Sequence, residues 1–468
     1  MAGNDPFRDR FQELKPAMRP EEANLEASRC LYCYDAPCIQ ACPTHIDVPR
    51  FIKQIASKNV EGSAKTILEA NALGHSCARV CPVEVLCEGS CVYLAWHEKP
   101  IEIARLQRFA TDLVYDANIQ PFKPGKDNGK AVAVIGAGPA GLSCATYLRR
   151  LGHPVTVFER QKVPGGLNSH GVAEYKMTQA TSLDEVKKCL ELGAKLEDGV
   201  EIGKDVSPET IEHEFAAVFV GIGLGPTNRL NVPGEDLPGV WDALSFIYHV
   251  KRRKLAPLGK SETTIVIGAG NTSIDAVTQS KRTGAERVIM AYRRGPEEMS
   301  AYDFEYDLAK SDGAEFLWNA APVMVLGKKK VEGVRFQKTR IARDGKLELL
   351  KETFDVKCDR VIKAIGQSKL VELATHLGLE LGPGGRIAVD PITLAASRDR
   401  WYAGGDSING GKEVVNAAAD GKRAAWNIHA ALTGVATPSP EHAYWVATIE
   451  GKKPVQVPNP GLRMKVHG

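Results

Sequence analysis

Apolar residues recur at helical spacing through the first quarter of the chain, as in EEANLEASRC and FIKQIASKNVEGSAKTILEANALG. Strand-like runs are scarce there, so the pattern predicts an all-helical domain over residues 1–125. The stretch QPFKPGKDNGK is rich in Pro, Gly and charge and is typical of a linker. From AVAVIGAGPAG onward, short apolar runs alternate with helical patterns, which predicts an α/β region with parallel sheets.

The composition of the chain argues against several classes of function and location. The chain has 468 residues, enough for about three domains. Its 60 basic and 57 acidic residues leave a net charge of +3, which argues against a nucleic-acid partner. The chain contains no run of about 18 apolar residues, so we expect no membrane span. The polar start MAGNDPFRDRFQELKP does not resemble a secretory signal. We therefore expect a cytoplasmic protein without a membrane or nucleic-acid partner.

Eight of the eleven cysteines lie within one short block of the sequence. Because disulfides are not expected in a cytoplasmic protein, another role is needed for these cysteines. They form two runs: Cys30, Cys33, Cys38 and Cys42, then Cys77, Cys81, Cys87 and Cys91. Eight thiolates suffice for two [4Fe–4S] clusters, and the fourth cysteine of such a run often binds a different cluster. Structural zinc is the alternative, but it favours pairs separated by two residues, and the second run has none. Unligated cysteines are a further alternative, and Cys144, Cys189 and Cys358 are expected to be packing residues.

The first α/β unit contains a dinucleotide-binding fingerprint. An apolar strand at 131–135 leads into Gly136, Gly138 and Gly141, with Pro139 and Ala140 inside the motif, and then into a helix. These glycines permit a tight turn, close approach of pyrophosphate and packing of the helix on the strand. Glu159 ends the next strand, at the position where an acidic residue binds the ribose hydroxyls of the dinucleotide. Gly166 and Leu167 follow, at a second place where the backbone can come close to a bound flavin. A plain structural turn is the weaker alternative.

A second fingerprint starts at TTIVIGAGNTSIDA, with Gly268, Gly270, Asn271 and Thr272, and with Ser in place of the third glycine. Its following strand ends in Arg293 and Arg294 instead of an acid. A basic residue there can hold a 2′-phosphate, which favours NADP, although a solvated arginine pair is the alternative.

Two such motifs in one chain are the plan of a flavoprotein that binds FAD and NAD(P)H. Gly405 and Asp406 follow a third expected strand, and Asp406 is a candidate for binding the flavin's ribityl chain, or else a turn-forming residue. We expect a second Rossmann-like domain inserted into the first. The expected boundaries are 126–255 and 363–437 for the FAD-binding domain, 256–362 for the NAD(P)H-binding domain and 438–468 for a C-terminal tail.

The blocks CLYCYDAPCIQACPTHIDV, NALGHSCARVCPVEVLCEGSC, IEIARLQRFATD and VVNAAADGKRAAW resemble the N-terminal half of dihydropyrimidine dehydrogenase and its separate bacterial NAD(P)H-oxidising subunit. The small subunit of glutamate synthase shares the plan. The resemblance implies that one cluster is bound by Cys30, Cys33, Cys38 and Cys91. It implies that the other is bound by Cys42, Cys81, Cys87 and Gln107, which leaves Cys77 outside the ligand set.

Two positions depart from the family. The segment after the flavin glycines reads GVAEYKMT, where the family often has two prolines. Ser300 stands near the place of a second basic residue for the 2′-phosphate, so both NADH and NADPH remain open.

The resemblance implies a reductase subunit that takes electrons from NAD(P)H and passes them to a partner with FMN and iron–sulfur clusters, which reduces uracil or thymine. No residue is assigned as a catalytic acid or base, because the cofactors carry the chemistry. The alternatives are the reductase subunit of a glutamate-synthase-like complex and a zinc-stabilised nucleotide-sensing module without turnover.

Overall fold

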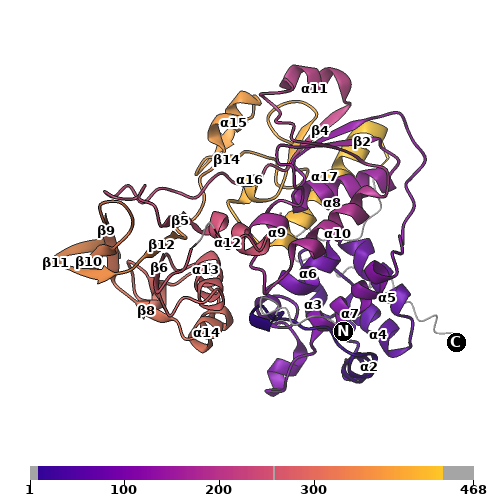
Figure 1. Cartoon of the computed structure of the whole chain (residues 1–468). Helices are drawn as coiled ribbons and strands as arrows, with labels where there is room; N and C mark the ends of the chain where they lie inside the picture. The colour runs from indigo at the N-terminus through magenta and orange to yellow at the C-terminus, as the bar shows by residue number, and fades with distance from the viewer. Residues whose placement is uncertain (1–8, 257–258, 436–468) are drawn as a thin grey trace. The chain divides into compact units, whose positions relative to one another are not determined.

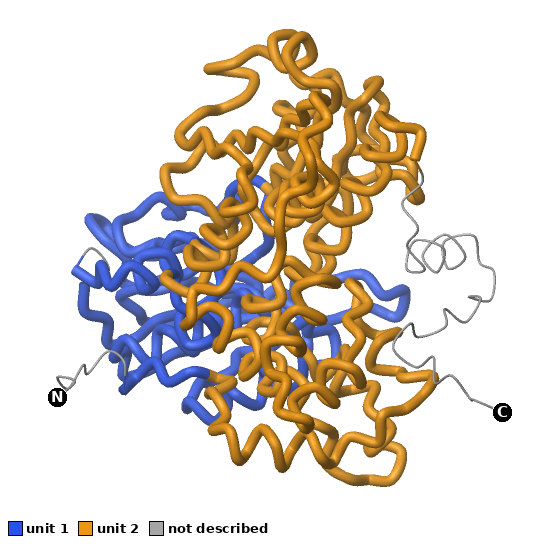
Figure 2. Tube along the Cα trace, turned by 90° about the vertical axis from the view of Figure 1, so that its right-hand side faces the viewer, with its two compact units in different colours: residues 1–13, 170–179, 225–368 blue, residues 14–169, 180–224, 369–468 orange. Residues whose placement is uncertain are grey.

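A computed structural model describes residues 9–256 and 259–435, so the expected tail at 438–468 lies outside the described residues. The chain forms two compact units (Figure 2). Unit 1 comprises residues up to 13, 170–179 and 225–368, and unit 2 comprises 14–169, 180–224 and the chain from 369. The expected fold class, a helical N-terminal domain followed by α/β nucleotide-binding domains, is confirmed.

Unit 2 begins with the helical domain. Its α-helices are α2 (Pro20–Ser28), α3 (Pro37–Gln40), α4 (Val48–Ala56), α5 (Val60–Ala70), α6 (Gly74–Val80) and α7 (Ile103–Asp116), with the 3-10 turns η1 (Val83–Val85) and η2 (Val92–Trp96). Asp47 and Asn59 cap α4 and α5 by accepting backbone N–H groups two residues into each helix. Phe51, Ile67 and Leu106 are fully buried in the common core, so the periodic apolar residues of this region form one helical domain.

The flavin-type glycine motif lies in a parallel sheet of the order β15-β4-β1-β2-β3. The strands are β1 (Val132–Ile135), β2 (Val155–Glu159), β3 (Lys195–Asp198), β4 (Ala217–Val220) and β15 (Trp401–Ala403). All of β1 and β4 is buried, as expected for central parallel strands. The other elements of this region are α8 (Pro139–Arg150), α9 (Leu167–His170), α10 (Gln179–Leu190), α11 (Pro208–Glu214), α15 (Val371–His376), β13 (Leu381–Gly382), β14 (Arg386–Ile387), α16 (Asp406–Asn409) and α17 (Val414–Thr433). Helices α8 and α17 pack side by side (Figure 1).

Unit 1 is built on a second parallel sheet of the order β5-β12-β6-β7-β8. Its strands are β5 (Val240–Asp242), β6 (Thr263–Ile267), β7 (Arg287–Ala291), β8 (Glu315–Leu317) and β12 (Arg360–Lys363). Its helices are α12 (Ala243–Lys251), α13 (Asn271–Arg282) and α14 (Asp303–Ser311), with the 3-10 turn η4 (Pro296–Glu298). An antiparallel sheet adds β9 (Ala320–Leu326), β10 (Gly333–Ile341) and β11 (Leu347–Lys357).

The units divide the chain at different places from those expected. Residues 225–255 belong to unit 1, because β5 pairs with β12 at the edge of the second sheet. Residues 363–368 also belong to unit 1. The unusual segment at 170–179 joins unit 1 as well, because Lys176 forms buried ion pairs with Asp275 (2.8 Å) and Glu305 (2.6 Å). Within the described residues, no helix combines the length and apolar character needed to cross a membrane.

Candidate cofactor sites

The first glycine motif forms the turn between β1 and α8. Gly136 has φ +101°, and a Cβ there would lie 2.5 Å from the Gly221 carbonyl oxygen. A Cβ on Gly141 would lie 1.9 Å from the Gly136 carbonyl oxygen. Both positions therefore require glycine, and α8 begins at Pro139 with Gly138 as its N-cap. Such a helix start, with free N–H groups, suits a pyrophosphate.

Glu159 lies beside this turn, at the end of β2. Its buried carboxylate accepts the backbone N–H groups of Ala137 and Gln161, both at 2.8 Å. Each carboxylate oxygen can accept more than one hydrogen bond, so capacity remains for ribose hydroxyls. The backbone thus holds the acid at the position where the fingerprint needs it.

The later flavin-site candidates come to the same turn. Gly166 has φ +54°, and a Cβ there would lie 2.8 Å from Gly138 Cα. Gly405, with φ +73°, lies close to Ala140, because a Cβ on Gly405 would be 3.1 Å from Ala140 Cβ. Asp406 accepts the Lys412 N–H at 3.0 Å, and burial raises the pKa of its carboxyl. Leu167 begins α9 directly after Gly166. Unit 2 therefore gathers the residues that the sequence predicted for one dinucleotide.

Asp420 joins this group without having been predicted. It lies on α17 and accepts the Gly405 N–H at 3.0 Å, and burial raises the pKa of its carboxyl to about 6. Its position in the helical pattern VVNAAADGKRAAW carries no signal that separates it from an ordinary polar helix residue.

The second glycine motif connects β6 to α13 in unit 1. Gly268 has φ +130°, and a Cβ there would lie 2.2 Å from the Ala364 carbonyl oxygen. Ser273, which replaces the third glycine, is fully buried and donates its hydroxyl to that same carbonyl at 3.2 Å. Asn271 accepts the Tyr302 N–H at 3.1 Å, so the segment after η4 folds against the motif. Thr272 is exposed on the first turn of α13.

The arginine pair follows β7, the neighbour of β6. Arg293 is exposed and Arg294 is half-buried. The Nε atom of Arg294 is buried without a hydrogen-bond partner, and in the described part of the chain neither guanidinium makes an ion pair. Ser300 lies over the motif, because a Cβ on Gly270 would be 3.4 Å from its hydroxyl oxygen. Both guanidinium groups are therefore available to pair with a phosphate group at the end of β7.

Four of the predicted cluster ligands line one cavity in the helical domain. We call these residues the outer cysteine group: Cys30, Cys33, Cys38 and Cys91. All four are half-buried, and apolar residues such as Val48, Ile52 and Ile103 line the same cavity. Burial raises the pKa of the Cys30 thiol to about 11, and the nearby thiols of Cys33 and Cys91 add to this shift. The two cysteine runs therefore meet here, as the resemblance implies.

The remaining predicted cysteine ligands form a second set, the inner cysteine group: Cys42, Cys81 and Cys87. Cys42 and Cys81 are buried and Cys87 is half-buried. Burial raises the pKa of the Cys87 thiol well above its usual range, and the thiols of Cys42 and Cys81 raise it further. The charges of Glu88 and Cys38 contribute as well, and both cysteine groups pack against one hydrophobic core.

Two buried residues, one on α6 and one on α7, are candidates for a fourth ligand. Gln107 is buried on α7, and its Nε2 donates to the Gly74 carbonyl oxygen at 2.6 Å. Cys77 is also buried, and a hydrogen bond between its thiol and that of Cys81, together with burial, raises the pKa of Cys81 well above its usual range. Across residues 9–256 and 259–435, no three His, Cys, Asp or Glu side chains are placed to hold a single metal ion. In a four-iron cluster each thiolate binds a different iron, so its ligands need not converge on one point.

Family models match both parts of the chain. Residues 7–119 match the model for the 4Fe-4S cluster domain II of dihydropyrimidine dehydrogenase. Residues 130–421 match the pyridine nucleotide-disulphide oxidoreductase model. The domain that holds both cysteine groups is therefore a [4Fe–4S] cluster domain, and the α/β region is a pyridine-nucleotide oxidoreductase.

Solved structures with low sequence identity share the α/β fold. Mycobacterium tuberculosis FprA in complex with NADPH matches with a TM-score of 0.54 at 19% identity, covering 69% of this chain and 90% of that one. The thioredoxin reductase of T. acidophilum matches with a TM-score of 0.52 at 22% identity, covering 64% of this chain and 98% of that one.

Curated relatives match along almost their whole length. The NAD-dependent dihydropyrimidine dehydrogenase subunit PreT of Salmonella typhimurium is 33% identical over 424 residues, covering 91% of this chain and 98% of the relative. The protein of the same name from Escherichia coli K12 is 33% identical over 429 residues, covering 92% and 99%. The chain therefore belongs to the family of NAD-dependent dihydropyrimidine dehydrogenase subunits and is a pyridine-nucleotide-dependent oxidoreductase.

Proposed function

We propose that this chain oxidises NAD(P)H at FAD and passes the electrons through two [4Fe–4S] clusters to a partner subunit. The partner carries FMN and iron–sulfur clusters and reduces uracil or thymine to 5,6-dihydropyrimidines. The observation that carries the proposal is the presence of both cysteine groups and the flavin-type glycine motif in one compact unit. When bound, FAD accepts a hydride and the clusters carry single electrons.

The residues of unit 2 fit FAD. The turn at Gly136 and Gly138 leaves backbone N–H groups at the start of α8 for the pyrophosphate. Glu159 is held by the backbone and can accept ribose hydroxyls. Asp406 and Asp420 lie at the start of α16 and on α17, where a polar side chain can bind the ribityl chain. In unit 1, the start of α13 offers the same kind of anion site to NAD(P)H.

The cysteine groups fit two clusters that share no ligand. We assign Cys30, Cys33, Cys38 and Cys91 to the outer cluster, which is supported by their common cavity. We assign Cys42, Cys81, Cys87 and Gln107 to the inner cluster. The amide of Gln107 supports this assignment, because its nitrogen is committed to Gly74 and its oxygen remains as a donor atom for iron.

Contacts between the flavin-binding part and the inner group support the order of electron transfer that we propose. Val415, at the start of α17, packs into the same core as Cys42 and Cys81, and the charge of Glu413 contributes to the raised pKa of Cys81. Helix α17 follows Gly405 and Asp406 directly. This arrangement supports a route from FAD through the inner cluster to the outer cluster and then to the partner.

Anaerobic assays with NADH test the proposal. The holoprotein alone should reduce artificial dyes and leave uracil and thymine unchanged, because FMN and pyrimidine sites are assigned to the partner. With an FMN-bearing dihydropyrimidine dehydrogenase subunit it should form dihydrouracil. Uracil reduction by this chain alone would overturn the division between two subunits. Activity only with a glutamate synthase large subunit would favour the alternative complex.

We further propose that NADH is the main donor, because the curated relatives are named NAD-dependent. Arg293 and Arg294 would supply residual NADPH use by pairing with its 2′-phosphate. Replacing both with Gln should lower kcat/KM for NADPH roughly tenfold, as expected for loss of a charged hydrogen bond, with little change for NADH. An unchanged ratio of the two kcat/KM values would mean that the pair is only solvated.

A further inference from the structure

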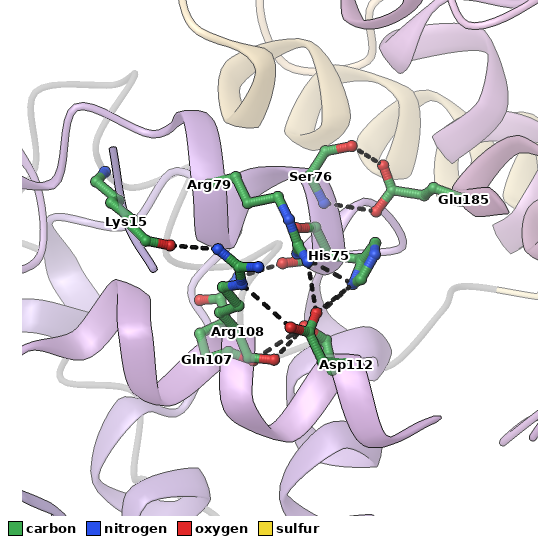
Figure 3. Close-up of polar contacts among 10 residues, drawn as sticks. Lys15, His75, Ser76, Arg79, Gln107, Arg108, Asp112 and Glu185 are labelled. Carbon is green, nitrogen blue, oxygen red and sulfur yellow. Dashed lines mark hydrogen bonds and ion pairs between the residues drawn. The ribbon is translucent and has the colours of Figure 1, made fainter. Parts of the chain in front are cut away.

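A buried carboxylate ties the flavin-binding part of unit 2 to a helix of the cluster domain (Figure 3). Glu185 lies on α10 and is 1% exposed. Its Oε1 accepts the Ser76 backbone N–H at 2.9 Å, and its Oε2 accepts the Ser76 hydroxyl. Ser76 is in the first turn of α6, the helix that carries Cys77 and ends just before Cys81. Glu185 therefore holds the start of α6 from outside the cluster domain.

The start of α6 in turn orients Gln107. The Gly74 carbonyl, two residues before Ser76, accepts Nε2 of Gln107 at 2.6 Å. A carbonyl oxygen can only accept, so the amide group that faces it must be the NH2 group. The amide oxygen, which is the only atom of this side chain able to bind iron, therefore points away from Gly74.

Contacts with α7 hold both ends of α6. Arg79, in the last turn of α6, pairs with Asp112 of α7 at 2.6 Å, and Arg108 of α7 pairs with the same carboxylate at 3.1 Å. His75, in the first turn of α6, stacks on Tyr115 of α7 with ring centroids 3.8 Å apart. These contacts, drawn in part in Figure 3, set the spacing of the two helices. Glu185 adds a contact to the first turn of α6 from the flavin-binding part.

Burial raises the pKa of the Glu185 carboxyl to about 7, and the hydrogen bonds from Ser76 oppose that shift. Burying an acid is costly, and here the carboxylate's partners belong to the cluster domain. We propose that Glu185 is a positioning residue for Gln107: it holds the first turn of α6 so that Gly74 orients the amide oxygen of Gln107 toward the inner cluster. This inference rests on the proposed ligation by Gln107.

Four variants of the holoprotein test the inference. Glu185→Gln and Ser76→Ala weaken the hold on α6, Gln107→Leu removes the amide, and Ser76→Thr keeps the hydroxyl. Glu174→Gln is the matched control, because Glu174 is also a buried glutamate, with its pKa raised to about 7, but it lies in unit 1. The readouts are the Mössbauer spectrum of isotopically enriched iron and the rate of iron loss to a chelator, both measured without substrate.

Glu185→Gln should change the spectrum of the Gln107-bound iron site and speed loss of the inner cluster roughly tenfold or more, as outer-sphere partners do elsewhere. Ser76→Ala should give a smaller change in the same direction, and Ser76→Thr and Glu174→Gln should match the unaltered protein. If Gln107→Leu changes the spectrum but Glu185→Gln and Ser76→Ala do not, Glu185 has no positioning role. If Gln107→Leu also leaves the spectrum unchanged, the proposed ligation fails and the inference falls with it.

Discussion

The two cysteine groups belong to one small domain and differ in their surroundings. The outer group is half-buried around a cavity that Leu31 also lines, and Leu31 and Tyr34, in the loop between its cysteines, are 48% and 63% exposed. The inner group is packed against the flavin-binding part. Lys422 on α17 is fully buried and donates to the carbonyl oxygens of Thr44, at 2.9 Å, and Ala70, at 2.7 Å.

Two clusters with the same kind of ligands can perform different tasks when one is near the surface and the other is enclosed. A cluster near the surface is accessible to an electron acceptor and also to oxygen. A cluster enclosed between two domains is protected, but it depends on the packing and hydrogen bonds that hold those domains together. We therefore expect damage to the inner group to propagate through unit 2, and solvent-borne attack to begin at the outer group.

The largest expected effect comes from removing an inner ligand. Cys87→Ser should lower the iron content from about eight to about four atoms per chain, because a four-iron cluster is lost. Cys77→Ser, at a more deeply buried position, should retain about eight, since Gln107 is the assigned fourth ligand. Iron analysis after anaerobic purification distinguishes the two variants. Equal losses would favour a set of four cysteines and remove the chemical asymmetry between the groups.

A smaller effect should follow from loosening the packing around the inner group without touching a ligand. Lys422→Met leaves the carbonyl groups of Thr44 and Ala70 without their donor, at a cost of about 1–3 kcal/mol for each unsatisfied group. Thermal denaturation of the holoprotein should shift to lower temperature, with earlier release of inner-cluster iron. Lys204→Met, at a side chain that is 75% exposed, is the control. No difference between these variants would mean that α17 does not support the inner group.

The smallest expected effect is a difference in rate. On exposure to air, the outer cluster should lose its iron several-fold faster than the inner cluster, because its cysteines are the more accessible. Mössbauer spectra recorded over time follow the two clusters separately, and the Cys87→Ser variant identifies the outer signal. Simultaneous loss of both signals would show that burial does not distinguish the groups.

The sequence predicted the features that depend on short spacings. The turn of Gly136 and Gly141 and the two cysteine runs are local patterns with a clear chemical meaning, and the structure places their residues together. The pairing of Cys91 with Cys30 came from a resemblance, because spacing alone does not say which run a cluster draws from. The compact units divide the chain before residue 255, because the short strand β5 pairs with β12, whose Val361 lies opposite Val240.

The sequence did not predict the roles of residues whose contact partners lie far away along the chain. Glu185 contacts a serine 109 positions away, and Lys422 contacts a threonine 378 positions away. Each looks like an ordinary charged residue on a helix. Their roles depend on tertiary packing between the cluster domain and the flavin-binding part, which no periodicity encodes.

We propose that one chain carries two four-iron clusters and one flavin. Iron, zinc and FAD analysis after anaerobic purification measures this cofactor content. We expect a brown-yellow protein with one FAD and about eight iron atoms per chain, the iron being divided between the outer and inner cysteine groups. A colourless protein with stoichiometric zinc and no flavin would contradict it.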